Sequence, residues 1–160
     1  MADFIIKIMA DWTILPIVVL GAYALLLKVP KGQKIKTYAL VLVAGLGAYL
    51  IAKLVASVYQ PSGIRPFEER GVEPGASYAD NAGFPSDHTL FAAAIVIAVW
   101  SQTRTKLITV TLVVFTLLMA VGRVLALVHT PLDILGAFLF AAVGALWYLN
   151  SRLDFRTSQK

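Results

Sequence analysis

The sequence of 160 residues contains no cysteine, which excludes disulfide bonds and thiol chemistry. Charged residues make up only 14% of the chain, too few for the surface of an ordinary soluble domain. Low-complexity tracts and internal repeats are also absent. Apolar residues, in contrast, account for 59% of the chain, and the mean hydropathy is +0.78. This composition predicts a protein that resides in a lipid bilayer.

The apolar residues form runs of the length needed to cross the hydrocarbon core of a bilayer, about 20 residues. We predict one all-α domain, residues 1–160, folded as a bundle of five transmembrane helices. The predicted spans are 12–29, 37–58, 85–103, 107–128 and 132–149. Residues 1–11 carry apolar side chains on one helical face, which fits a short interfacial helix or the start of the first span.

Basic residues predict the orientation of the bundle, because short cytoplasmic loops retain lysine and arginine. With five spans, nine of the fourteen basic residues fall on one side: Lys28, Lys31, Lys34, Lys36, Arg104, Lys106, Arg152, Arg156 and Lys160. We expect this side to be cytoplasmic, in a multi-pass protein of the plasma membrane. The net charge of +5 then reflects orientation and contact with anionic membrane lipid, and it requires no nucleic-acid partner.

Two cations, Lys53 and Arg123, lie inside predicted spans at similar depths below the opposite, extracytoplasmic surface. An ionisable residue inside a membrane is costly and by default indicates a functional site with a charged partner. For Lys53, extension of the side chain to the interface is the alternative. Carboxylates available as partners on this side are Asp133, Glu68, Glu69 and Asp80.

The segment FPSDH, residues 84–88, places three polar side chains at the start of a predicted span. Ser86 is positioned as the helix N-cap, so that the backbone N–H groups of residues 87–89 are left unpaired. Such a helix end attracts anions, and phosphate is the common biological one. A cap without a ligand also explains Ser86 and Asp87. It does not explain His88, because a protonated histidine is disfavoured at the positive end of a helix.

A second polar group lies in GRVLALVHTPLDILG, residues 122–136. Thr130 followed by Pro131 predicts an N-cap and a first helical position, which puts Asp133 in the first turn of the last span. His129 closes the preceding span, so the carboxylate lies within reach of its ring. A carboxylate on one imidazole nitrogen fixes the tautomer and leaves the other nitrogen as a nucleophile or base.

In combination, these segments resemble the three motifs of the type 2 phosphatidic acid phosphatase superfamily: RPF at 65–67, FPSDH at 84–88, and R-x5-H-x3-D at 123, 129 and 133. The phrase FPSDHT, with GR and H-x-P-x-D downstream, is most similar to the bacterial undecaprenyl-diphosphate phosphatases of the bacitracin-resistance type. The resemblance covers residues 53–136, about half of the chain. The flanking spans match only in being hydrophobic.

The resemblance implies hydrolysis of a lipid diphosphate, undecaprenyl diphosphate, to the monophosphate, with no metal and no cofactor. It implies that His129 attacks the terminal phosphorus to give a phosphohistidine and that Asp133 orients it. His88 would protonate the leaving oxygen and later activate water. The residues implied to surround the phosphate are Arg65, Arg123, Ser86, Lys53 and Asp87. Phosphoryl transfer rewards such positive charge around the equatorial oxygens.

Three positions depart from the pattern of this superfamily. Lys53 stands twelve positions before Arg65, whereas the superfamily usually places its lysine seven positions before, where this chain has Val58. Asp87 stands where many relatives have glycine, and Gly122 where many have serine. The aspartate lowers affinity for an anion unless its side chain points away, and the glycine removes one hydroxyl donor.

The connection 59–84 is too long to serve only as a link between helices. Long loops in compact domains are often lids or binding elements, so we expect this one to contribute to an active site on the outer face. In the last span, Ala137, Ala141 and Ala145 form a row that allows close approach of another helix. That helix belongs either to the same chain or to a second subunit.

Other functions remain open from the sequence. The same groups fit phosphatase action on another phospholipid monoester, such as phosphatidate or phosphatidylglycerol phosphate, or a vanadate-dependent oxidation. A non-enzymatic transporter is disfavoured, because transporter sites lie near the membrane midplane and these charges cluster at one face. His88, His129, Asp87 and Asp133 have metal-binding side chains, but the neighbouring Arg65 and Arg123 fit an anion better than a cation.

Overall fold

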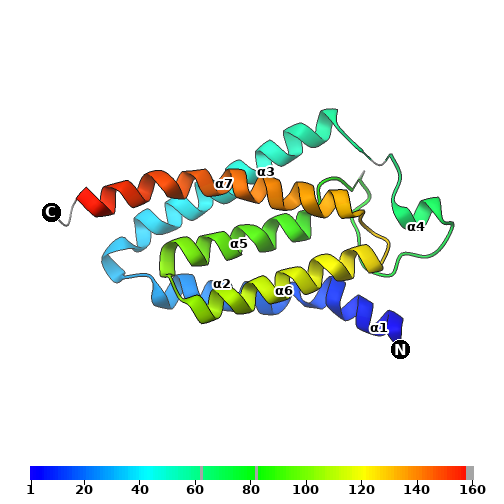
Figure 1. The fold of residues 1–160 in the computed structure, drawn as a ribbon, viewed down its shortest axis with the longest axis horizontal. Helices are drawn as coiled ribbons and strands as arrows, with labels where there is room; N and C mark the ends of the chain where they lie inside the picture. The colour runs from blue at the N-terminus through cyan, green and yellow to red at the C-terminus, as the bar shows by residue number, and fades with distance from the viewer. Residues whose placement is uncertain (62, 82, 158–160) are drawn as a thin grey trace.

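The computed structural model describes residues 1–61, 63–81 and 83–157, and side chains up to residue 149. The elements of these ranges are all helices, as predicted (Figure 1). In chain order they are α1 (Ala2–Lys7), the π-helical η1 (Ile8–Trp12), α2 (Ile14–Lys28), the 3-10 helix η2 (Lys31–Gln33), α3 (Lys34–Val58), α4 (Pro66–Glu69), α5 (Asp87–Thr103), α6 (Lys106–Leu125) and α7 (Pro131–Thr157).

Four helical segments of the described chain are long and apolar enough to cross a bilayer: Ala2–Lys28, Lys31–Val58, Lys106–Leu125 and Pro131–Leu149. Helix α5 has only 17 residues and lies at the centre of the bundle, in contact with α2, α3, α6 and α7 (Figure 1). Small residues such as Ala92 and Ala98 are buried along it and permit these contacts. The count of five membrane spans stays a prediction.

The N-terminal residues are continuous with the first candidate span. α1, η1 and α2 follow one another along one candidate span, Ala2–Lys28. η1 packs against α6, where Ala10 is fully buried. Of the two expectations for residues 1–11, the structure therefore favours the start of the first span.

The predicted span 107–128 is too long at its C-terminal end. Helix α6 ends at Leu125, and Leu127 has a φ of +59°. A right-handed helix cannot continue through that backbone conformation, which an L-residue rarely adopts. His129 therefore lies in a turn between two helices and does not close a helix.

The two ends of the bundle differ in charge. The connections at 29–33 and 104–105 lie at one end with the C-terminal end of α7, whereas α4 and the turn before α7 lie at the other (Figure 1). This arrangement gathers the predicted basic segments at one end. Among their nine basic residues, Lys160 lies outside the described residues, as do the side chains of Arg152 and Arg156.

Helices α3 and α7 approach closely because small residues line both faces. Ala48 and Ala52 of α3 and Ala137 and Ala141 of α7 are buried in one cluster. A Cβ on Gly144 would lie 3.0 Å from the Cβ of Ala48. The alanine row of α7 thus packs on a neighbouring helix of its own chain, as small residues do inside membranes.

Replacing Gly144 by alanine tests this contact. The added Cβ would lie 2.9 Å from the Ala44 carbonyl oxygen and 3.0 Å from the Cβ of Ala48, and overpacking of a tight interface typically costs about 1–3 kcal/mol. We expect Gly144→Ala to lower the unfolding temperature in detergent, measured by differential scanning fluorimetry. The matched control is Gly45→Ala on α3, where an added Cβ meets open space. Equal unfolding temperatures for the two variants would contradict the packing described.

Candidate active site

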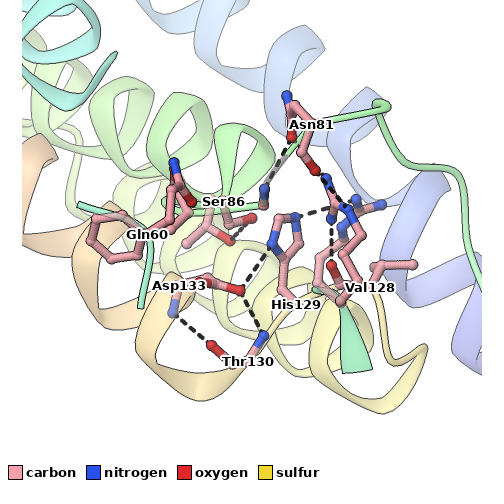
Figure 2. A network of polar contacts seen from close by, with 12 residues as sticks. Gln60, Asn81, Ser86, Val128, His129, Thr130 and Asp133 are labelled. Atoms are coloured by element: carbon pink, nitrogen blue, oxygen red, sulfur yellow. Dashed lines mark hydrogen bonds and ion pairs between the residues drawn. The ribbon is translucent and has the colours of Figure 1, made fainter. Parts of the chain in front are cut away.

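Four charged or titratable side chains are buried together at the end of the bundle opposite the basic connections. The exposed fractions are 4% for Arg65, 1% for Arg123, 4% for His129 and 3% for Asp133. They come from the connection before α5, from α6, from the turn after it and from α7. Groups of this kind remain buried only when each is paired or hydrogen-bonded. Figure 2 shows the polar contacts around His129.

The turn after α6 brings His129 back to the end of that helix. The Val128 amide donates to the Arg123 carbonyl over 3.3 Å, and the Leu127 amide donates to the Val124 carbonyl over 3.0 Å. The chain therefore reverses within a few residues. As a result, Nε2 of His129 lies 3.5 Å from Nη2 of Arg123.

Asp133 holds the other nitrogen of the ring. Its Oδ2 lies 3.4 Å from Nδ1 of His129 and accepts from the Thr130 amide over 2.7 Å (Figure 2). The Asp133 amide in turn donates to Oγ1 of Thr130 over 3.2 Å. This reciprocal cap fixes the start of α7 at Pro131, as predicted from the sequence. Since a carboxylate only accepts hydrogen bonds, it favours the tautomer with the proton on Nδ1 and the lone pair on Nε2.

Most of the N–H groups of the Arg65 guanidinium already have protein acceptors. The guanidinium donates to the carbonyl groups of Val128, Ala79 and Asn81 and to the Asn81 side chain. Four of its five N–H bonds are thereby engaged. Arg65 thus ties the connection before α5 to the turn that carries His129, and burial lowers the pKa of its guanidinium.

Arg123 is held from one side only. Its Nη1 donates to Oδ1 of Asp11 over 3.1 Å and to the Ser77 carbonyl over 2.7 Å. Its Nη2 faces His129, and Nε has no hydrogen-bond partner among the described residues. The edge formed by Nε and Nη2 therefore has no carboxylate or carbonyl acceptor among the described residues, and it lies beside the imidazole. Such a fork matches two phosphoryl oxygens.

The start of α5 adjoins this cluster through its backbone. Ser86 is the N-cap of α5, as predicted, and its amide donates to the Asp133 carbonyl over 3.2 Å. Its hydroxyl does not cap the helix but accepts from Oγ1 of Thr89 over 3.2 Å. His88 lies half-buried in the first turn. None of the hydrogen bonds in the described chain joins His88 to His129 or Asp133.

Lys53 forms an ion pair with Asp87. Its Nζ lies 2.9 Å from Oδ2 and 2.8 Å from Oδ1 of that carboxylate, with 34% and 42% of the two side chains exposed. Lys53 also lies over the ring of Tyr49, 5.3 Å from its centroid. The Lys53–Asp87 pair is more exposed than the side chains around His129, and it is not part of the buried cluster that contains the two arginines.

The charged partner of Arg123 is Asp11, which was not among the carboxylates expected from the sequence. Asn81, which binds Arg65, was also missed. The one available signal was the cost of a buried arginine, which demands an anion. That argument names no residue, and Asp11 lies 112 positions away from Arg123.

Residues 34–156 match the family model of the PAP2 superfamily. The chain belongs to this superfamily. A curated relative, the undecaprenyl-diphosphatase BcrC of Bacillus subtilis (strain 168), is 36% identical over 113 residues, which are 69% of this chain and 56% of that protein. The chain thus spans little more than half of the length of that relative. No solved structure matches the chain. In this PAP2 chain, Asp11 lies outside the segment that the family model covers.

The environment of His129 acts on its protonation. Burial lowers the pKa of the imidazole below its ordinary value, the Asp133 carboxylate beside Nδ1 opposes this, and the positive charge of Arg123 adds to the lowering. A lowered pKa keeps the ring neutral at pH 7 and extends the neutral form to lower pH than for an ordinary histidine. The lone pair on Nε2 is therefore retained over that range.

A histidine titration checks this assignment. In protein labelled with ¹⁵N-histidine, we expect His129 to titrate below about 6.5, the ordinary histidine value, and to hold its proton on Nδ1 while neutral. His129→Gln identifies the resonance by its disappearance. A titration midpoint above that value, or a neutral form protonated on Nε2, would contradict the assigned geometry.

Proposed function

We propose that this chain hydrolyses the terminal phosphate of a lipid diphosphate, undecaprenyl diphosphate, to leave the monophosphate. The observation that carries the proposal is the His129 ring, with a carboxylate at Nδ1 and the open edge of an arginine beside Nε2. Membership of the PAP2 superfamily and the similarity to an undecaprenyl-diphosphatase support this choice of reaction.

In the proposed reaction, Nε2 of His129 attacks the terminal phosphorus and the bond to the bridging oxygen breaks. His88 gives a proton to that oxygen as the lipid monophosphate leaves. His88 then takes a proton from water, whose oxygen attacks the phosphohistidine and releases inorganic phosphate. Asp133 stabilises the positive charge on the His129 ring during both steps. No step in this sequence uses a metal or a cofactor.

The two buried arginines have different roles in this proposal. Arg123 binds two phosphoryl oxygens through Nε and Nη2 and so holds the phosphorus next to His129. Arg65 has one N–H left for a phosphoryl oxygen, and it fixes the position of the His129 turn through Val128. Ser86 and the amides at the start of α5 complete the anion site. Through Arg65, the connection 59–84 contributes to the active site.

An apolar groove offers a place for the lipid chain. It has a volume of about 440 Å³ and lies between α3, α5 and α7, where residues including Val41, Ala44, Leu90 and Ala141 line it. Asp87, next to His88 in sequence, lines it as well. A substrate with its phosphate at His129 can therefore place apolar carbons against these helices. A water-soluble phosphate ester has no apolar chain to fill this groove.

The orientation of the bundle supports an extracytoplasmic site. The cationic connections 28–36 and 104–106 lie at the end of the bundle away from the turn before α7, which carries His129 (Figure 1). Such segments are retained in the cytoplasm. We therefore place the reaction at the outer face of the plasma membrane, where a polyprenyl diphosphate presents its head group to His129.

An assay of purified protein tests the proposed function. Undecaprenyl diphosphate, phosphatidate and phosphatidylglycerol phosphate are supplied separately in detergent with EDTA, and released phosphate is measured. We expect turnover of the diphosphate to exceed that of both monoesters and to persist in the chelator. Preference for a monoester would replace the proposed substrate, and activity restored only by a divalent ion would overturn the mechanism.

Variants in the same assay test the assigned roles. His129→Ala is expected to abolish turnover, because it removes the nucleophile. Asp133→Asn is expected to lower kcat by roughly 10²–10⁴-fold, since the amide no longer selects the tautomer. The control is Asp80→Asn on the exposed part of the connection, which should leave turnover unchanged. A fully active His129→Ala would end this mechanism.

Lys53 is proposed to neutralise Asp87 and to contact the phosphate through its remaining N–H. If so, Lys53→Ala lowers kcat/KM by about tenfold, the value of roughly one charge-assisted hydrogen bond. The same loss should appear in an Asp87→Gly background. A loss that vanishes with Asp87→Gly would show that Lys53 only screens the carboxylate and makes no phosphate contact.

A further inference from the structure

We propose that Asp11 is a positioning residue of the active site, which holds the Arg123 guanidinium so that its open edge faces His129. The inference rests on the proposed phosphatase function and extends it to a part of the chain outside the family-matched segment 34–156. It concerns an ion pair between the first helical segment and α6, with 1% of the Arg123 side chain and 14% of the Asp11 side chain exposed.

Asp11, Ser77 and Arg123 are each hydrogen-bonded to the other two. The Asp11 carboxylate accepts from the Ser77 amide over 3.2 Å and 3.0 Å, from the Ser77 hydroxyl over 2.8 Å, and from Nη1 of Arg123 over 3.1 Å. Ser77 also contacts Arg123 directly, since its carbonyl accepts a hydrogen bond from the same Nη1 over 2.7 Å. Both hydrogens of Nη1 are thereby engaged, and the guanidinium cannot rotate without breaking two bonds.

The packing of η1 on α6 independently shows that this approach is built into the fold. A Cβ on Gly122 would lie 2.7 Å from the backbone nitrogen of Ala10 and 2.8 Å from the backbone carbonyl carbon of Met9. Only glycine allows the two backbones to come so close. Gly122 precedes Arg123, and Ala10 precedes Asp11, so the contact brings the ion pair together. The π-helical turn at Ile8–Trp12 is typical of functional positions in helices.

The geometry explains what Asp11 does for the reaction. With Nη1 engaged, the part of Arg123 left for a ligand is the edge of Nε and Nη2, which lies beside Nε2 of His129. A carboxylate near a phosphate weakens anion binding by its charge. Orientation of the Arg123 guanidinium accounts for the Asp11 carboxylate at this place, because stabilisation of a transition state depends on hydrogen-bond donors that are fixed before the charge develops. Asp11 should therefore raise kcat even though its charge opposes substrate binding.

The first test compares Asp11→Asn with Asp3→Asn, an exposed residue of the same helical segment. The asparagine keeps the shape but loses the charge-assisted bonds, so we expect kcat to fall about ten- to a hundredfold. We expect KM to change little and Asp3→Asn to match the unchanged chain. A lower KM with an undiminished kcat would show that Asp11 is only an unfavourable charge and would overturn the inference.

A double-mutant cycle separates positioning from simple stabilisation of the fold. Asp11→Asn should cause no further loss of kcat in an Arg123→Ala background, because the side chain that Asp11 positions is absent there. A loss of the same factor in both backgrounds would show that Asp11 supports the structure and not Arg123. Unfolding temperatures of all four proteins, measured in the same detergent, check that each variant is folded.

Orthovanadate, which adopts the five-coordinate geometry of the phosphoryl-transfer transition state, tests the positioning of Arg123 without lipid turnover. We expect it to raise the unfolding temperature of the unchanged chain and to do so less in Asp11→Asn, with Asp3→Asn as the control. An equal rise in Asp11→Asn would overturn the inference. A normal difference in this shift with no hydrolysis of any lipid phosphate would support the positioning role and reject the proposed function.

Discussion

The His129 ring, held between the Asp133 carboxylate and the Arg123 guanidinium, is the arrangement on which the rest of this structure depends. The carboxylate fixes the proton on one nitrogen, so the other keeps its lone pair. The guanidinium stands beside that lone pair with two N–H groups unengaged. An imidazole alone is a weak nucleophile toward an anionic phosphate. Fixed positive charge beside it lowers the electrostatic part of that barrier.

Burial of these charges explains the elements around them. An isolated arginine inside a bilayer costs several kcal/mol, and the cost falls only if its N–H groups find acceptors. Arg123 finds them on the first helical segment and on the connection before α5, whereas Arg65 finds them on that connection and on the His129 turn. The connection and the N-terminal helix therefore belong to the buried polar cluster, although neither contains His129.

The sequence predicted features that depend on neighbouring residues. Ser86 and Thr130–Pro131 marked helix starts correctly, because capping is local chemistry. The end of α6 was predicted three residues too late, since nothing in the composition shows that Leu127 takes a left-handed conformation. The pairing of Arg123 with Asp11 was not predicted, because it is set by helix packing between residues far apart in the chain. The free-energy cost of burying Arg123 indicated that it needs an anionic partner, and only the fold identified that partner as Asp11.

Trapping the covalent intermediate tests the central claim most directly. Protein mixed with a polyprenyl diphosphate labelled in its terminal phosphate is quenched in alkali, which preserves phosphohistidine, and digested for mass spectrometry. The account predicts label on the peptide that contains His129, and none on that peptide when Asp133→Asn is quenched at the same early time. Rapid turnover with no labelled histidine, or label on His88, would contradict it.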